Sequence, residues 1–258
     1  MLAVLSPAKS LDFDSPPATS KEATRPRMPG RTAELVGVMA GKTPDEIRRL
    51  MRVSPALARL NADRYAGWDD AEARPAILAF DGDVYRGMDA PATFDTRDYT
   101  RAQKTVRILS GLYGVLRPMD AIRPYRLEMG TALATGRGDD LYAFWGDAIT
   151  DALRTDVDES PGADVLVNLA SREYFAAVRP DVLGRRVVAP VFLDAKGDGE
   201  PRIVAFHAKR ARGAMAGWMV RERVDRPSHL PGFDGLGYAH DPERSAPDAP
   251  AFVRRHPG

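Results

Sequence analysis

Short apolar runs recur along this chain, each ended by proline, glycine or polar residues and separated from the next by segments with helical spacing. Runs of that length between turn signals are typical of buried β-strands, because helices need longer periodic stretches. The chain therefore predicts strands at residues 2–6, 76–80, 106–109, 164–169, 187–193 and 202–206, the last two turned at residues 196–199. The alternation with helices predicts an α/β fold of mixed α+β character.

Two short helices form a predicted hairpin at about residues 43–65. Thr43 precedes Pro44 and Ser54 precedes Pro55, and a hydroxyl N-cap followed by proline is a strong signal for a helix start. Only residues 52–54 join the two helices, which is short enough for an antiparallel pair. Further helices are predicted at residues 31–40, 141–154 and 208–224.

No linker and no internal repeat divides the 258 residues, so we expect a single domain over 1–258 with the hairpin as an insertion. From residue 227 to 258, proline, glycine and charge dominate, which predicts a coil-rich C-terminal tail. The chain has neither a signal-peptide pattern nor a long apolar run. We therefore expect a cytoplasmic location and no membrane partner.

Composition excludes several kinds of chemistry. The chain has no cysteine, which rules out disulfides, thiolate metal sites and thiol nucleophiles. Its four histidines show no metal-ligand spacing, so the sequence predicts no metal site and no cofactor. Asp81 and Asp83 are a candidate metal or acid–base pair, although Asp-Gly-Asp is also common in turns. No catalytic residue is assigned.

The near-zero net charge of +1 hides two basic segments. Residues 202–226 hold seven Lys/Arg against two Asp/Glu, and residues 101–126 hold six against one. In the first segment, Lys209, Arg210 and Arg212 lie near the start of a predicted helix, where the helix dipole disfavours cations. A bound phosphate or carboxylate would resolve this conflict, and so would carboxylates from elsewhere in the fold.

In the second segment, a predicted strand runs into closely spaced glycines and is followed by arginines interleaved with tyrosines. Arg117 and Arg126 could hold phosphate in bidentate fashion. Tyr113 and Tyr125 could stack on a base or close a core, and Arg126 could instead pair with Glu128. Polar residues also follow predicted strands, where α/β proteins build binding sites: Ser6, Lys9, Asp81, Asp83, Asn168 and Ser171.

Together these segments resemble the YaaA family of bacterial peroxide stress proteins. The matching stretches follow one another along nearly the whole chain and are too long for chance agreement. They are LSPAKSLD at 5–12, FDGDVYRG at 80–87, LSGLYGVLRP at 109–118, PYRLEMG at 124–130, LYAFWGD at 141–147, NLAS at 168–171 and KRARG at 209–213.

The resemblance implies a single α/β domain of unusual topology with a basic cleft and a helix-hairpin-helix-like element. It also implies binding of double-stranded DNA and protection against damage from peroxide and iron. The predicted hairpin lacks the glycine pair that is usual in DNA-binding hairpins, but Arg48, Arg52 and Arg59 make it basic.

Our first hypothesis is therefore a DNA-binding protein of the oxidative stress response. The alternatives are an enzyme acting on a nucleotide or nucleic acid in the same cleft, and an iron-binding protein. The expected partner is double-stranded DNA or a nucleotide-like anion. Phosphate-binding candidates are Lys9, Lys104, Arg117, Arg126, Lys209, Arg210, Arg212, Arg48, Arg52 and Arg59, and polar cleft candidates are Ser6, Asp83, Tyr113, Tyr125, Glu128, Asn168 and Ser171.

Overall fold

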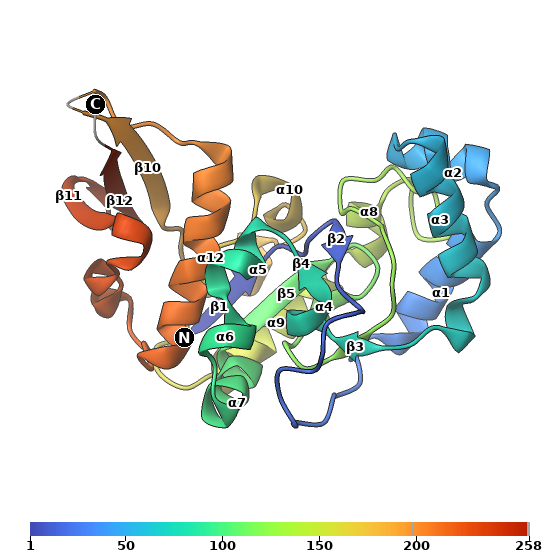
Figure 1. The fold of residues 1–258 in the computed structure, drawn as a ribbon, viewed down its shortest axis with the longest axis horizontal. Coiled ribbons are helices and arrows are strands. Elements are labelled where there is room, and N and C mark those ends of the chain that lie inside the picture. Colours follow the sequence, from blue (N-terminus) through green and yellow to red (C-terminus); the bar gives the residue numbers. More distant parts are fainter. Residues whose placement is uncertain (198, 257–258) are drawn as a thin grey trace.

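A five-stranded sheet forms the centre of the fold in this computed structural model, which describes residues 1–197 and 199–256 (Figure 1). The strand order is β6-β5-β1-β8-β9, in which β1 pairs in parallel with β5 and β8, and β6 runs antiparallel to β5. Every residue of β1 is buried, as in parallel strands covered on both faces. The strands are β1 (Leu2–Leu5), β5 (Val106–Ser110), β6 (Gly114–Leu116), β8 (Val165–Asn168) and β9 (Arg186–Val188).

Helices lead into these strands and pack around them. The carboxylate of Asp95 accepts hydrogen bonds from the N–H groups of Arg97 and Asp98, which fixes the start of the helix that runs directly into β5. The long helix α12 contacts β1 and packs across α5 (Figure 1). The helices of this layer are α5 (Asp83–Met88), α6 (Ala90–Thr93), α7 (Thr96–Thr105), α8 (Leu141–Trp145), α9 (Ala148–Glu159), α10 (Arg172–Phe175), α11 (Pro180–Leu183) and α12 (Ala205–Arg221).

A helical part lies at one end of the long axis (Figure 1). It consists of α1 (Pro29–Ala40), α2 (Pro44–Met51) and α3 (Pro55–Ala66). Thr43 and Glu46 form a reciprocal capping box at the start of α2, and the Ser54 hydroxyl accepts from the N–H of Leu57 at the start of α3. Both caps predicted from the sequence are confirmed.

The prediction of a coil-rich tail over residues 227–258 is wrong for residues 239–246 and 249–256, which form strands. Strands β11 (Ala239–Ala246) and β12 (Ala249–His256) form a hairpin, and β12 pairs in parallel with β10 (Val191–Lys196) in a three-stranded sheet at the other end of the molecule (Figure 1). Most residues of β11 and β12 are exposed or only half-buried, so the composition of this hairpin resembles that of a loop. Ala251 and Phe252 alone bury β12 against the core, and the pairing strand β10 lies far away in sequence.

Three other element predictions are corrected. Residues 76–79 form a helical turn, α4 (Ala76–Ala79), followed by β4 (Phe80–Asp81), because a fully buried apolar run has no periodicity that separates helix from strand. The helix predicted over 141–154 is broken at Gly146, whose φ is 50°. Of the strand pair predicted at 187–193 and 202–206, only an antiparallel bridge between Asp194 and Arg202 forms. The first strand is divided between β9 and β10, which lie in different sheets, and α12 begins at Ala205. Part of the predicted turn, residue 198, lies outside the described residues.

The buried apolar side chains of these elements form one contiguous core, so the chain is a single mixed α/β domain as predicted. Within the described residues, no helix has the length and apolar character needed to cross a membrane. Short strand pairs complete the fold: β2 (Ser10–Leu11) with β4, and β3 (Arg74–Pro75) with β7 (Ala121–Ile122).

Candidate functional site

Three neighbouring strands of the central sheet end in polar residues at the same edge. Ser6 follows β1, Ser110 ends β5 and Asn168 ends β8. Because β5, β1 and β8 are adjacent and parallel, their carboxyl ends lie side by side. We call this region the carboxyl edge. Open α/β sheets bind ligands outside the carboxyl ends of their strands, so it is the first candidate site.

Hydroxyl groups connect the strand ends to the helices that follow. The N–H of Ser171 donates to Ser6 Oγ at 2.8 Å, and the Tyr85 hydroxyl donates to the Ser6 carbonyl at 3.1 Å. Asn168 accepts the N–H of Ala170 at 3.0 Å through Oδ1. Ser6, Asn168 and Ser171, all predicted as cleft residues, are therefore brought together. They position α5 and α10 against the sheet.

Lys9, Arg126 and Glu128 also meet at this edge. Arg126 Nε donates to Glu128 Oε1 at 3.0 Å, and Lys9 Nζ lies 3.4 Å from the same oxygen. The side chains of Arg126 and Glu128 are 17% and 15% exposed, whereas that of Lys9 is 68% exposed. Arg126 thus has an internal carboxylate partner, the alternative that the sequence left open. Lys9 is the one of the three whose charged group is open to solvent.

The tyrosines of the second basic segment close the core. Tyr125 OH lies 2.6 Å from Ser110 Oγ, and Tyr113 OH accepts the N–H of Arg123 at 2.9 Å. Their rings meet edge to face with centroids 5.3 Å apart. Burial raises the pKa of both tyrosines, and it does the same for Tyr85. These hydroxyls stay protonated at neutral pH and act as hydrogen-bond groups; their buried rings offer no stacking platform for a base.

The structure places Lys104 and Arg117 at the opposite edge of the sheet. Lys104 lies in the last turn of α7, just before β5 begins, and Arg117 follows the antiparallel strand β6. Both line a cavity of about 250 Å³ together with Arg107 and Asp156. Arg117 donates to the fully buried Asp120 at 2.8 Å. These two candidates are separated from Lys9 and Arg126 by the length of the strands.

The cations of α12 lie on a helix that is held very close to α5. A side chain at Gly213 would collide with the Val84 carbonyl, and one at Gly87 with the carbonyl of Arg210. Lys209 and Arg210 are exposed, and burial lowers the pKa of the half-buried Arg212. Within residues 1–197 and 199–256, none of the three has a carboxylate within 4.0 Å. The internal ion pairs considered from the sequence are thus not found among these residues.

The hairpin arginines lie far from α12, toward the other end of the long axis (Figure 1). Arg52 and Arg59 are exposed, and Arg48 Nε lies 3.7 Å from Asp45 Oδ1. The candidate pair Asp81 and Asp83 shows no metal geometry, because Arg86 donates to both carboxylate oxygens of Asp81 at 2.9 Å. Asp83 instead occupies the first turn of α5, next to the carboxyl edge.

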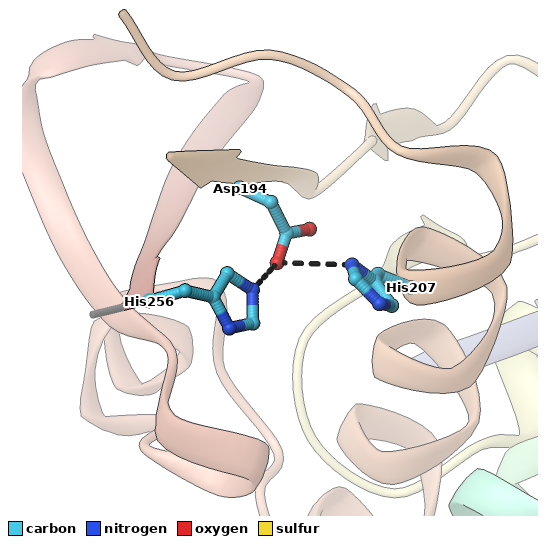
Figure 2. A group of neighbouring side chains, drawn as sticks. All are labelled: Asp194, His207 and His256. Atoms are coloured by element: carbon cyan, nitrogen blue, oxygen red, sulfur yellow. Dashed lines mark hydrogen bonds and ion pairs between the residues drawn. The ribbon is translucent and has the colours of Figure 1, made fainter. Parts of the chain in front are cut away.

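One cluster of potential ligand side chains was not predicted from the sequence. Figure 2 shows Asp194, His207 and His256 pointing toward one another from β10, α12 and β12. His256 Nε2 lies 2.9 Å and His207 Nδ1 3.3 Å from Asp194 Oδ1. The sequence predicted no histidine pair with metal-ligand spacing, whereas in the fold these two histidines and Asp194 can each offer one ligand atom to the same point. Spacing could not reveal it, because the three residues come from separate elements, which are brought together by the β10–β12 pairing and by the packing of α12 against β10.

Burial acts to raise the pKa of Asp194, but hydrogen bonds from Tyr238, His256 and Arg254 outweigh it and leave that pKa below its usual value. Tyr238 OH donates to Oδ2 at 2.7 Å and Arg254 Nε to Oδ1 at 2.8 Å. The carboxylate is thus ionised and held from several sides at neutral pH.

Comparison with known proteins gives a consistent result along the chain. A family model described as "Peroxide stress protein YaaA" matches residues 1–244. A UPF0246 protein of Burkholderia mallei strain SAVP1 is 51% identical over 261 residues, covering 99% of this chain and 99% of that protein. A UPF0246 protein of Leptothrix cholodnii is 52% identical over 261 residues, covering 100% of this chain and 99% of that protein.

Proposed function

The chain belongs to the YaaA family of peroxide stress proteins, and from this premise we propose that it binds double-stranded DNA as part of the peroxide stress response. In this role it acts in the cytoplasm, protects DNA and limits iron-dependent damage. The expected partner is a phosphate backbone, since backbone contacts need cations and no particular base sequence.

The observation that carries the proposal is a pair of exposed cations in the second turn of α12, which begins at Ala205 rather than at residue 208 as predicted. Lys209 and Arg210 are exposed, and no described carboxylate lies within ion-pair distance of either. The helix dipole acts mainly within the first turn, so it does not oppose these two cations, and without an internal partner their charge is available to an anionic ligand. A phosphate backbone supplies such anions in a row.

The hairpin supports the proposal in a second place. Arg52, which follows α2, and Arg59, in α3, are exposed at the far end of the molecule. The backbone at Arg52 adopts a left-handed conformation with φ 51°, the conformation that glycine takes in tight hairpins. We infer that these arginines and the α12 cations contact separate phosphate segments.

Salt dependence tests the proposal. The affinity of the full chain for a duplex of mixed sequence is measured by fluorescence anisotropy between 50 and 200 mM salt. The double variant Lys209→Gln/Arg210→Gln should weaken binding and reduce the log–log salt slope by about one to two, since each phosphate contact contributes about 0.9. The matched control is Arg185→Gln/Arg186→Gln, which removes two arginines that already pair with Asp158 and Asp248. An equal slope in both double variants, or a flat slope in the wild type, would refute this role for α12.

The carboxyl edge favours a second function, turnover of a nucleotide or nucleic acid. Lys9 presents its ammonium beside Glu128, and Ser6 and Ser171 lie at neighbouring strand ends. An ammonium beside a carboxylate is suited to proton transfer at a bound anion. A Lys9→Ala variant that still binds duplex DNA but no longer protects cells from peroxide would support this function. Unchanged protection would count against it.

A further inference from the structure

The cluster of Asp194, His207 and His256 lies on a face that the strand register builds. Asp194 pairs with Arg254 across β10 and β12, and His256 follows Arg254 by two residues, so all three side chains share one face of the sheet. His207 comes from the first turn of α12 above that face (Figure 2). One ligand atom from each of Asp194, His207 and His256 lies within 4.8 Å of the others.

One atom of this cluster lacks a partner. His207 Nδ1 is buried, and although it lies 3.3 Å from Asp194 Oδ1, it makes no hydrogen bond to any described residue because the contact is off the hydrogen-bond axis. Buried polar atoms are almost always paired, so an orphaned imidazole nitrogen points to a missing ligand. A neutral imidazole nitrogen is a preferred ligand of zinc, copper, nickel and iron.

The carboxylate is held as metal-ligating carboxylates are. Tyr238 OH donates to its Oδ2, and Arg254, whose guanidinium lies 4.7 Å from the Tyr238 ring centroid, donates to its Oδ1. Such outer contacts orient a ligand and are a regular feature of metal sites. The Arg254 charge also offsets that of the carboxylate, so we expect weaker binding than at a thiolate site.

The cluster opens to a pocket of about 530 Å³, which Lys196, Glu200 and Arg202 also line. A metal on these three side chains would therefore keep open positions for water or another ligand. Two imidazoles and one carboxylate with open positions is the donor set of several catalytic zinc and iron(II) sites, and closed structural sites use four protein ligands.

We propose that Asp194, His207 and His256 form a binding site for a divalent first-row transition metal. His207 shares α12 with Lys209 and Arg210, but the proposed metal site uses neither cation, so metal binding can be tested independently of DNA binding.

Metal titration of the full chain tests the proposal. After treatment with a chelator, the wild type should take up one Zn²⁺ per chain in isothermal titration, and Co²⁺ should give a visible absorption band. His207→Ala and His256→Ala should each lower Zn²⁺ affinity at least about tenfold, the low end of the loss seen when even outer-shell partners are removed. His229→Ala is the matched control, because His229 is exposed and outside the cluster; its affinity should equal that of the wild type.

A readout of folding separates ligation from a structural role. Zn²⁺ should raise the melting temperature of the wild type and of His229→Ala, because it binds only the folded state, and should not raise that of His207→Ala or His256→Ala. If an alanine variant does not fold, His207→Gln takes its place. The proposal is overturned if the wild type binds neither metal, or if the cluster variants bind Zn²⁺ as tightly as His229→Ala.

Discussion

Both edges of the central sheet carry ion pairs between a cation and a carboxylate, but the cations differ in how deeply they are buried. We call the edge where the parallel strands begin, opposite the carboxyl edge, the amino edge. There Arg107 donates to both oxygens of Asp156 at 2.6 and 2.8 Å, and their side chains are only 6% and 1% exposed. Arg27 donates to the same carboxylate from the long loop before α1. At the carboxyl edge, the carboxylate of Glu128 is shared with a lysine that is 68% exposed.

The difference teaches that the number of cations in a segment does not measure its capacity to bind anions. Arg107 and Arg126 belong to the same basic segment, yet each is paired with a carboxylate inside the protein. A buried guanidinium is held by its partner, because separating the two would leave an uncompensated charge. Cations available to a ligand are those that lack such a partner, and among the described residues these include Lys209 and Arg210 on α12 and Arg52 at the tip of the hairpin.

The largest expected effect is at the amino edge. Asp156→Ala should lower the free energy of unfolding by about 3–5 kcal/mol, because it leaves two arginines without their shared carboxylate. Urea unfolding followed by circular dichroism measures this. Asp151→Ala is the control on the same helix; its carboxylate is 52% exposed and should matter by less than about 0.5 kcal/mol. Equal losses of unfolding free energy in the two variants would contradict a special structural role for the buried carboxylate of Asp156.

Acid should act through the same carboxylate. Burial acts to raise the pKa of Asp156, but hydrogen bonds from Arg107 and Arg27 outweigh it and lower that pKa below its usual value. The contribution to stability is therefore complete above the unfolded pKa of about 3.9 and is lost as pH falls through the lower folded pKa. The stability difference between wild type and Asp156→Asn should be constant from pH 7 to about 5 and shrink below about 4. A difference that stayed constant down to pH 3 would contradict this assignment.

Local signals in the sequence predict the elements that depend on local physics. The buried runs of β1, β5 and β8 and the caps at Thr43 and Ser54 are in place, because each needs only its own residues to form. The same reasoning fails for residues 76–79, where a buried apolar run folds as a helical turn, and for β12, whose partner strand is remote in sequence.

The candidate site divides in the same way. Ser6, Asn168 and Ser171 could be predicted to lie together, because the ends of parallel strands meet at one edge. The partners of Arg117 and Arg126 were within three residues in the sequence, but whether each pair is buried depends on the packing around it. The cluster of Asp194, His207 and His256 could not be predicted, because its residues meet only through contacts between elements that are distant in sequence.

An intermediate effect is expected at the carboxyl edge. Ser6→Ala removes the hydroxyl that accepts the N–H of Ser171, and an unpaired N–H group in a partly buried position costs about 1–2 kcal/mol. The exposed Ser228→Ala provides the control and should change the free energy of unfolding by less than about 0.5 kcal/mol. A loss as large as that of Asp156→Ala would mean that both edges are equally structural.

The smallest effect on stability is expected at Lys9, and there the contrast between the edges is sharpest. An exposed ammonium 3.4 Å from a carboxylate contributes little to folding, since water screens the pair, so Lys9→Ala should change the free energy of unfolding by less than about 0.5 kcal/mol. Lys9→Arg keeps the charge and exchanges a compact ammonium for a planar guanidinium. If the carboxyl edge acts on an anion, Lys9→Ala should lose peroxide protection without losing stability. Lys9→Arg should keep that protection if the positive charge is sufficient, and should lose it if a compact ammonium is required. If Lys9→Ala lowered the free energy of unfolding as much as Asp156→Ala, this lysine would instead have a structural role.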